Sequence, residues 1–334
     1  MVIMKVKRKL HVSPAALTFM PSFIIVFIFV YVFIAYTIRI SLSKNWMPGK
    51  QDFTLPKPWY SNYRTLVNAG RFQADIRNTI IFTIFFLSIS IVAGLLLAIA
   101  VSSMNRSRVF FRNLFILPYA VSFIVTGVIW RWIFNPISGI NLLFKYAGIS
   151  SLYQHAFGSP LQPQWMTSPS VLGNVNSLLE RVIPGGTFLQ VQIGIPVALL
   201  PVIFAASWQL CGFAMAMFLA GLSSIPHELR EAAAIDRATG FRYYWSIALP
   251  SLVPMGVTCL VILTSVSLKI FDLIYAMSGS GIGFSTDMPG IYVYETMYKA
   301  LRYPLGAAAS IFMLVSVCIV VLPYLLRFSK AGEE

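Results

Sequence analysis

Six long apolar runs constrain this sequence more than any other feature. Each is about as long as the roughly 20 residues that a helix needs to cross a bilayer core of about 30 Å. The runs cover residues 15–38, 79–101, 114–134, 198–222, 249–274 and 307–326. The sequence therefore predicts an all-α integral membrane protein, built as a bundle of six transmembrane helices, with residues 79–326 forming a five-helix core.

The composition agrees with a membrane protein and disfavours a nucleic-acid binder. Apolar residues make up 57% of the 334 positions and charged residues 11%, whereas an ordinary soluble domain has about 25% charged residues. A net charge of +14 would suit a nucleic-acid partner if the basic residues gathered on one water-exposed face. They lie instead between the apolar runs, so the expected partner is the lipid bilayer and no nucleic acid.

The N-terminus has the charge order of a signal peptide, with basic residues followed by the first apolar run. That run has 24 residues, more than the roughly 7 to 15 of a signal peptide, and no small-residue cleavage site ends it. We therefore expect residues 15–38 to be a retained transmembrane helix, preceded by a basic segment at 1–14.

The distribution of lysine and arginine predicts the orientation. The segments predicted to be cytoplasmic are 1–14, 102–113, 223–248 and 327–334, and those predicted to be outside are 39–78, 135–197 and 275–306. The former carry 12 basic residues in 60 positions and the latter 11 in 135. Because cytoplasmic loops favour basic residues, both termini are predicted to be cytoplasmic in a multi-pass protein of the cell membrane. Seven basic residues in 39–78 run against the bias.

The outer loop at 135–197 is long and contains several prolines. Loops of more than about 12 to 15 residues are usually functional or disordered. A docking surface for a partner and a plain insertion fit this loop equally well.

The inner segment at 223–250 is polar but is patterned as a helix. Ser224 is a candidate N-cap, Pro226 suits the first turn, and Gly240 is a candidate C-terminal stop. Small and apolar residues form one narrow face and acidic residues supply charge for a partner. These are Leu229, Ala232 and Ala233 on the face, and Glu228, Glu231 and Asp236 for the charge. On composition alone, a solvated loop is the favoured interpretation.

Motifs in and around this segment change that interpretation. Glu231-Ala232-Ala233 is followed, at a fixed spacing, by Ile247, Leu249 and Pro250, and this pattern resembles the EAA loop of ABC importer permeases. The flanking sequences FLAGL (218–222), IP (225–226), EL (228–229), FDLIY (271–275), YVY (292–294) and WRWIFN (130–135) resemble permeases of the maltose-transporter type. The resemblance is dense from about residue 114 to 320.

The resemblance implies a type I importer permease whose EAA segment is a short cytoplasmic coupling helix, resting in a groove of an ATPase subunit. The expected coupling residues are Glu228, Glu231, Ala232, Ala233, Asp236, Arg237, Gly240, Leu249 and Pro250. The implied partners are a second permease, two ATP-binding cassette subunits and an extracytoplasmic solute-binding protein, with a sugar as cargo. The chain itself is expected to be no enzyme and to bind no cofactor, since ATP and Mg²⁺ belong to the partner ATPase subunits.

One position departs from the family pattern. The family has glycine in the sequence DGA, where this chain has Asp236-Arg237-Ala238. If the position requires positive φ, an arginine there is strained. The alternative, which we favour from sequence, is that the turn shifts to Gly240.

A few polar residues inside or beside the apolar runs are candidates for the cargo path. Trp208 and Gln209 lie at mid-span, where a ring beside an amide suits a sugar, although a tryptophan in a bundle is more often packing. Asp272 and Tyr275 are the next candidates. Lys269 and Asp272 are three positions apart and are expected to form an ion pair on one helical face. Arg131, between two tryptophans, favours an interfacial anchor.

Other classes of membrane protein fit less well. Gly49-Lys50 lacks the remaining residues of a P-loop, so any ATPase must be another chain. No HExxH or GxSxG motif occurs, which argues against a membrane hydrolase. An ion-driven transporter usually carries several carboxylates within its spans, whereas Asp272 is the one that this reading places there. A permease for a non-sugar solute stays open as an alternative.

The orientation can be tested with a membrane-impermeant thiol reagent on intact cells. Cysteines introduced at Ser159 and Ser224 are expected to differ, because position 159 is predicted to face outward and position 224 the cytoplasm. If position 224 is labelled and position 159 is not, the predicted orientation is the wrong way round.

Overall fold

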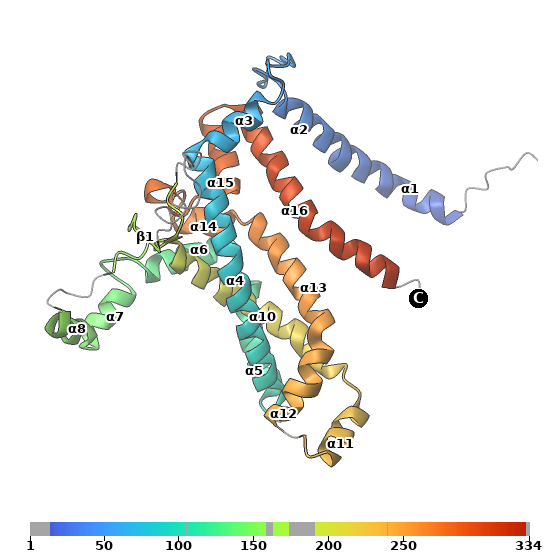
Figure 1. Ribbon diagram of the computed structural model, residues 1–334, viewed down its shortest axis with the longest axis vertical. Coiled ribbons are helices and arrows are strands. Elements are labelled where there is room, and N and C mark those ends of the chain that lie inside the picture. The colour runs from blue at the N-terminus through green and yellow to red at the C-terminus, as the bar shows by residue number, and fades with distance from the viewer. Residues whose placement is uncertain (1–13, 105, 158–162, 174–190, 239, 332–334) are drawn as a thin grey trace, which may run out of the picture.

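The computed structural model describes residues 14–104, 106–157, 163–173, 191–238 and 240–331, and it is almost entirely helical (Figure 1). Its helices are α1 (Pro14–Val26), α2 (Phe33–Ser41), α3 (Ser61–Asn68), α4 (Gly70–Ser102), α5 (Arg108–Ile116), α6 (Phe123–Ile133), α7 (Ile140–Tyr146), α8 (Ile149–Phe157), α10 (Leu199–Ser223), α11 (His227–Ile235), α12 (Phe241–Tyr243), α13 (Leu249–Leu268), α14 (Asp272–Met277), α15 (Pro289–Tyr294) and α16 (Tyr303–Ala331). Irregular helical turns occur at Phe27–Val32, Leu117–Ala120, Tyr244–Ala248, Ile282–Phe284 and Glu295–Lys299. Two short strands, β1 (Val171–Leu172) and β2 (Ile195–Pro196), pair antiparallel, with Val171 opposite Pro196.

Five helical stretches within the described residues are long and apolar enough to cross a membrane. They are Thr18–Ser41, Gly70–Ser102, Leu199–Ser223, Tyr244–Leu268 and Tyr303–Leu326. These coincide with five of the six predicted runs. The second stretch begins at Gly70 instead of residue 79, because a polar helical turn precedes its apolar part.

The third predicted run, 114–134, is not a single straight helix. Arg108–Ala120 and Phe123–Ile133 are bent by 95° at the break between them. Pro118 removes a backbone donor, and Val121 and Ser122 are extended, with ψ of 142° and 149°. The Ser122 hydroxyl then accepts a hydrogen bond from the Val125 N–H at 3.3 Å and caps α6. The bent pair accounts for a sixth span only if both halves belong to it.

The fifth predicted run, 249–274, is also divided. Helix α13 ends at Leu268, and Lys269 leaves helical geometry with φ of −120°. Helix α14 starts only at Asp272. The ion pair expected between Lys269 and Asp272 is therefore wrong: both side chains are exposed, and no ion pair joins them among the described residues.

The core lies between α4 and α10, which cross in close contact. Phe82 and Phe86 of α4 are fully buried and stack on each other at 5.3 Å between ring centroids. They pack against Leu199, Val202 and neighbouring residues of α10. Gly94 permits a close approach of the two helices, because a Cβ at this position would lie 2.5 Å from the Ala214 Cβ and 2.9 Å from the backbone nitrogen of Met215.

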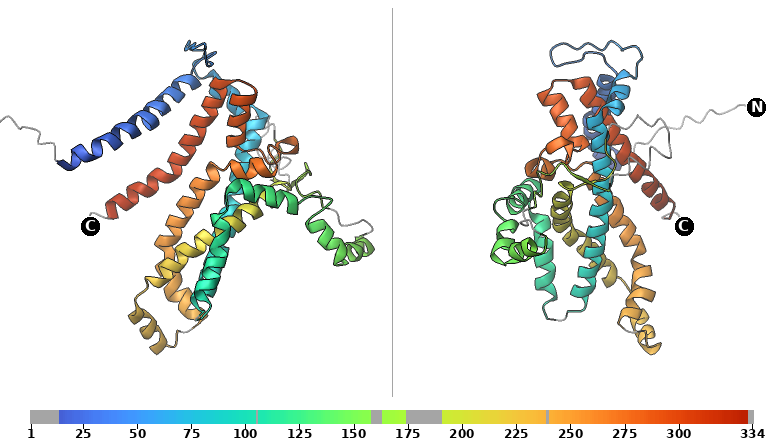
Figure 2. Two further views of the ribbon diagram at one scale, coloured as in Figure 1. Left: turned by 180° about the vertical axis from the view of Figure 1, so that it is seen from behind. Right: turned by 60° about the vertical axis from the view of Figure 1, so that its left-hand side comes forward.

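The helices define two ends of the molecule. Helix α11 lies at one end, and α3 and the α15 region lie at the other (Figure 1). Helix α1 splays away from the remaining bundle, as the left view of Figure 2 shows, whereas α2 packs against α16. Only 6% of the first span is buried within the chain, so its surroundings must be lipid or another subunit.

The contact between α4 and α10 predicts a glycine requirement. Gly94→Ala should destabilise the protein by about 1 to 3 kcal/mol, because the added methyl group overpacks the crossing. The matched control is Gly256→Ala in α13, where the nearest atom is a Phe218 ring carbon at 3.6 Å. Thermal unfolding of the purified full-length chain measures both. Equal melting temperatures for the two variants would contradict this account of the crossing.

Candidate functional site

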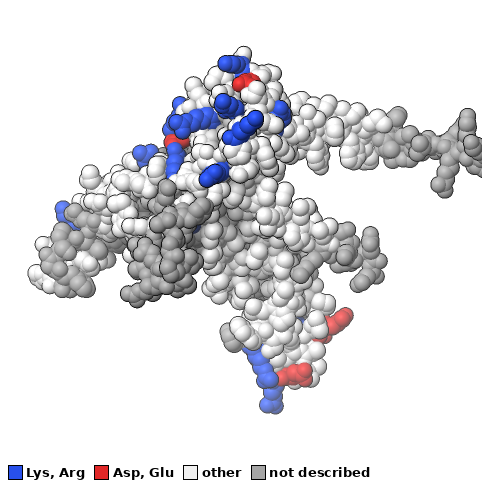
Figure 3. Space-filling view, turned by 45° about the horizontal axis from the view of Figure 1, so that its top comes forward, with Lys and Arg blue, Asp and Glu red and all other residues white. Residues whose placement is uncertain are grey.

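Helix α11 projects from the end of the bundle and presents most of its surface to solvent (Figure 1). Glu228, Glu231 and Asp236 are exposed, and Leu229 is 46% exposed. Only Ala233 is buried. Figure 3 shows acidic and basic side chains together at this end. An amphipathic helix that packs weakly on its own chain is suited to dock a partner.

The start of α11 differs from the sequence expectation. Ser224 does not cap it, because its hydroxyl donates to the Gly221 carbonyl at 2.8 Å, at the end of α10, and the N-cap position of α11 is held by Pro226. Pro226 is the residue before the first turn, with φ of −55° and ψ of 141°. Glu228 lies in the first turn, where a negative charge favours the helix dipole.

The end of α11 turns at Arg237, not only at Gly240. Arg237 has φ of 55°, in the left-handed region, and Gly240 has φ of 58°. The Ala238 N–H bonds to the Ala233 carbonyl at 2.8 Å and the Arg237 N–H to the Ala234 carbonyl at 3.2 Å. This is a Schellman motif with arginine at the position that usually holds glycine. Our expectation that the turn shifts to Gly240 was therefore wrong.

One side chain ties α11 to the next span. The Arg230 guanidinium donates to the Tyr243 hydroxyl at 3.1 Å and lies 5.7 Å from its ring centroid. Leu249 is half-buried and Pro250 exposed at the start of α13. His227 and Glu231 are 3.1 Å apart, but their side chains are 80% and 67% exposed, so the pair adds little stability and leaves Glu231 available.

The side chains of Trp208 and Gln209, which are adjacent at mid-span, have different surroundings. Gln209 is buried, and its amide nitrogen donates to the Val121 carbonyl at 2.7 Å. That carbonyl lies at the break between α5 and α6, so Gln209 satisfies a backbone group that the break exposes. Trp208 is 38% exposed and stands edge-on to Trp130, with 5.5 Å between ring centroids.

An apolar cavity of about 790 Å³ lies next to this pair of tryptophans. Its walls come from α6, α7, α10 and the 163–168 segment, including Trp130, Trp165 and Phe204. Asp272 is exposed at the start of α14, while Tyr275 stacks on Phe271 at 5.1 Å. No hydrogen bond, ion pair or ring contact among the described residues joins Trp208 or Gln209 to Asp272 or Tyr275, and the role of all four stays a prediction.

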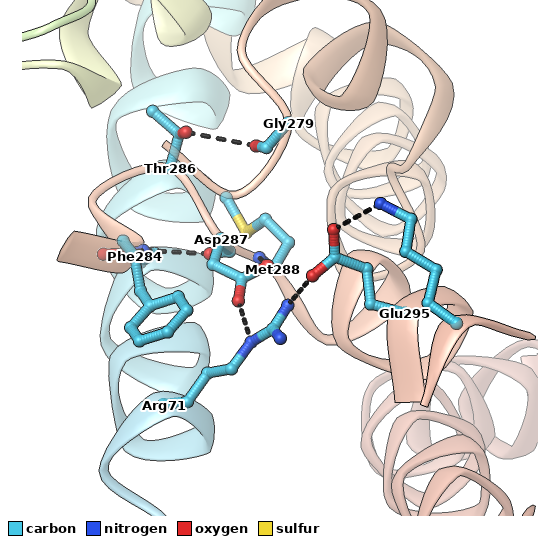
Figure 4. A network of polar contacts seen from close by, with 9 residues as sticks. Arg71, Gly279, Phe284, Thr286, Asp287, Met288 and Glu295 are labelled. Carbon is cyan, nitrogen blue, oxygen red and sulfur yellow. Dashed lines mark hydrogen bonds and ion pairs between the residues drawn. The ribbon is translucent and has the colours of Figure 1, made fainter. Parts of the chain in front are cut away.

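A polar network at the opposite end was missed by sequence reasoning (Figure 4). The Arg71 guanidinium of α4 contacts Asp287 and Glu295, each at 2.6 Å, and Glu295 also bonds to Lys299 at 2.9 Å. We call these four residues the outer clasp. They join the start of α4 to a segment more than 200 positions later, so the pairing could not be read locally.

The loop that carries Asp287 is fastened to α4 by further hydrogen bonds. The Asn78 amide donates to the carbonyls of Phe284 and Asp287, both at 2.9 Å. The Asp287 side chain is fully buried, and this burial raises its pKa against the opposing effect of Arg71. For Glu295, partial burial acts upward, but hydrogen bonds from Lys299 and Arg71 leave its pKa lowered. The sequence feature that could have revealed this network is the set of charged residues Arg71, Asp75 and Arg77, which directly precede the second predicted apolar run.

The apolar spanning helices, with an exposed polar helix at one end, define an integral membrane protein. A model of the binding-protein-dependent transport system inner membrane component family matches residues 90–329. A probable ABC transporter permease of Pyrococcus horikoshii is 31% identical over 82% of both chains. The chain belongs to the family of binding-protein-dependent transport system inner membrane components.

Two further similar proteins have names that specify a transported solute. The xylose/arabinose import permease of Haloferax volcanii is 29% identical, over 93% of this chain and 86% of its own. In fold, the chain resembles a bacterial alginate ABC transporter in complex with an alginate pentasaccharide-bound periplasmic protein, with a TM-score of 0.68. The sequence identity there is 20%, and the match covers 92% of this chain and 91% of the other.

The left-handed backbone conformation of Arg237 predicts that glycine at this position stabilises the end of α11. Arg237→Gly should relieve about 1 to 2 kcal/mol of backbone strain and slow hydrogen exchange at the end of α11 by about 5- to 30-fold. Arg242→Gly is the matched control, since it removes the same charge from a helical position and should speed local exchange. Faster exchange in Arg237→Gly than in the native protein would disprove the strain at this position.

Proposed function

We propose that this chain is the membrane-spanning subunit of an ATP-driven importer for carbohydrates, and that α11 is its coupling helix. The observation that carries the proposal is the exposed α11, which bears the EAA sequence at the end of the spanning helices. The sugar permeases among its relatives support a carbohydrate cargo.

The proposed assembly contains a second permease, two ATP-binding cassette subunits and an extracytoplasmic solute-binding protein. The complex of the alginate transporter with a periplasmic protein supports the last of these partners. In this assembly the partner subunits bind Mg²⁺-ATP and hydrolyse it, and this chain is not catalytic. The α11 end faces the cytoplasm, as do both termini, and the outer clasp faces outward.

The coupling follows from the connections of α11. One end of α11 continues into α10 and the other leads through α12 to α13, so a push on α11 reaches two spanning helices. The contact between Arg230 and Tyr243 stiffens the second connection. Closure of the ATPase subunits would thus move packed helices as rigid bodies, and the path would open alternately to the two sides.

The cargo path is proposed to run beside Trp208, in reach of the cavity that Trp130 borders. An exposed indole ring offers a stacking surface for a sugar, whereas Gln209 is bound to the Val121 carbonyl in this conformation. Asp272 and Tyr275 would contribute only if α14 lines the same path. These assignments rest on position and chemistry.

The coupling role of Glu231 can be tested by charge reversal. In the assembled complex in proteoliposomes, Glu231→Lys is expected to abolish ATP-driven uptake. The reason is that the proposed ATPase groove is complementary to a negative charge at this position, and lysine places a positive charge there. Loss should appear either as release of the ATPase subunits or as ATP hydrolysis that no longer drives uptake. Both are measured on the same sample.

A matched control reverses a half-buried carboxylate far from α11. Asp52→Lys changes the net charge equally but lies in the 39–78 segment, so uptake should persist. Native uptake rates in Glu231→Lys would refute the coupling helix. If the native complex drives uptake of no sugar in a labelled panel but does transport another solute, the carbohydrate assignment fails while the coupling role stands.

A further inference from the structure

A second carboxyl group is buried beside the outer clasp. Asp75 of α4 has no exposed surface, and neither of its side-chain oxygens has a hydrogen-bond partner among the described residues. Asp75 lies one helical turn after Arg71 and one turn before Asn78 on the same face of α4, and both of these side chains contact Asp287, so the two carboxyl groups are neighbours. Two carboxyl groups therefore share one buried site.

The nearby cations are committed to other acceptors. Arg71 binds Asp287 and Glu295, and Arg77 donates to the Asn78 side-chain oxygen and the Gln192 carbonyl. The titratable and charged groups around the pair come from α4, the Asp287 turn, α15 and the segment after it. They are Arg71, Arg77, Tyr292, Glu295, Lys299 and Arg302. None of the described groups donates a hydrogen bond to Asp75.

A buried carboxylate without hydrogen bonds is costly, and the cost rises when a second carboxylate faces it. Protonation removes the charge and supplies an O–H donor that can turn toward Asp287. We propose that Asp75 and Asp287 bind one proton between them, and that this proton keeps the outer clasp closed.

The clasp would open by separation of the two acids. With the proton present, Asp287 keeps its contacts with Arg71 and with the Met288 N–H at 3.1 Å. Without it, two facing anions repel, and the loop held to α4 through Asn78 moves away. The proton thus links the outer end of the α4 bundle to the external pH, whatever solute the protein carries.

The direction of the pH effect follows from where the proton is held more tightly. The closed form binds a proton that the open form releases at the ordinary carboxyl pKa of about 3.9. Closure is therefore fully favoured below that value and weakens as the pH rises toward the higher value of the closed pair. Between the two, one proton changes the opening equilibrium about tenfold per pH unit.

Hydrogen exchange on the full-length chain in lipid nanodiscs tests this linkage between about pH 5 and 8, where wild-type opening of the 279–295 segment should rise with pH until the pKa of the closed pair is passed. Asp75→Asn keeps the shape of the protonated acid, so it should stay closed with no slope after correction for intrinsic exchange. Asp287→Asn should also lose the slope, but should open more at every pH because Arg71 loses an acceptor.

Asp52→Asn is the control, since Asp52 is a half-buried acid in the 39–78 segment, bonded locally to Thr54, and its loss should leave the slope intact. A flat wild-type profile, or an unchanged slope in Asp75→Asn, would overturn the proposal. So would opening that follows the sodium concentration instead of pH when sodium is exchanged for potassium, because the pair would then bind a metal cation.

Discussion

The structure depends on one constraint, which is that backbone polar groups withdrawn from water must find partners within the protein. Straight helices meet it by themselves, and each departure from a straight helix needs a specific device. At the break between α5 and α6, Ser122 caps the new helix and Gln209 binds the Val121 carbonyl. Even at the solvent-exposed end of α11, two backbone hydrogen bonds close the turn around Arg237. The sites of interest in this chain are the places where such devices occur.

These departures divide the molecule into two functional ends joined by packed helices. At one end α11 leaves the bundle, held by Arg230 and by its connections to α10 and α13. At the other, Arg71 brings the start of α4 together with Asp287 and Glu295. Between them α4 and α10 approach closely at Gly94, so the two ends are joined by a tightly packed crossing. Such packing transmits displacement as rigid-body motion better than as local deformation.

The sequence predicted the spans that are straight and missed the points at which spans break. Hydropathy counts apolar residues and does not detect where helical geometry stops, so 114–134 and 249–274 each read as one helix. Pro118 and the Ser122 cap were local signals that could have revealed the first break. The end of α13 at Leu268 has no comparable signal in the sequence. Because the helix ends there, Lys269 and Asp272 do not share a helical face and the expected ion pair does not form. Arg237 shows the opposite case, because the family pattern correctly marked a strained position that we had explained by moving the turn.

What the sequence by itself determined is the membrane class, the approximate spans and the identity of the α11 segment, since apolar length and a contiguous motif are local properties. Only the tertiary structure decided that Gln209 serves a backbone carbonyl and that Trp208 does not share its surroundings. It alone brought Arg71 and Asp75 to Asp287 across more than 200 positions. The physical reason is that a charge in a sequence has no defined partner or solvent exposure until packing fixes both.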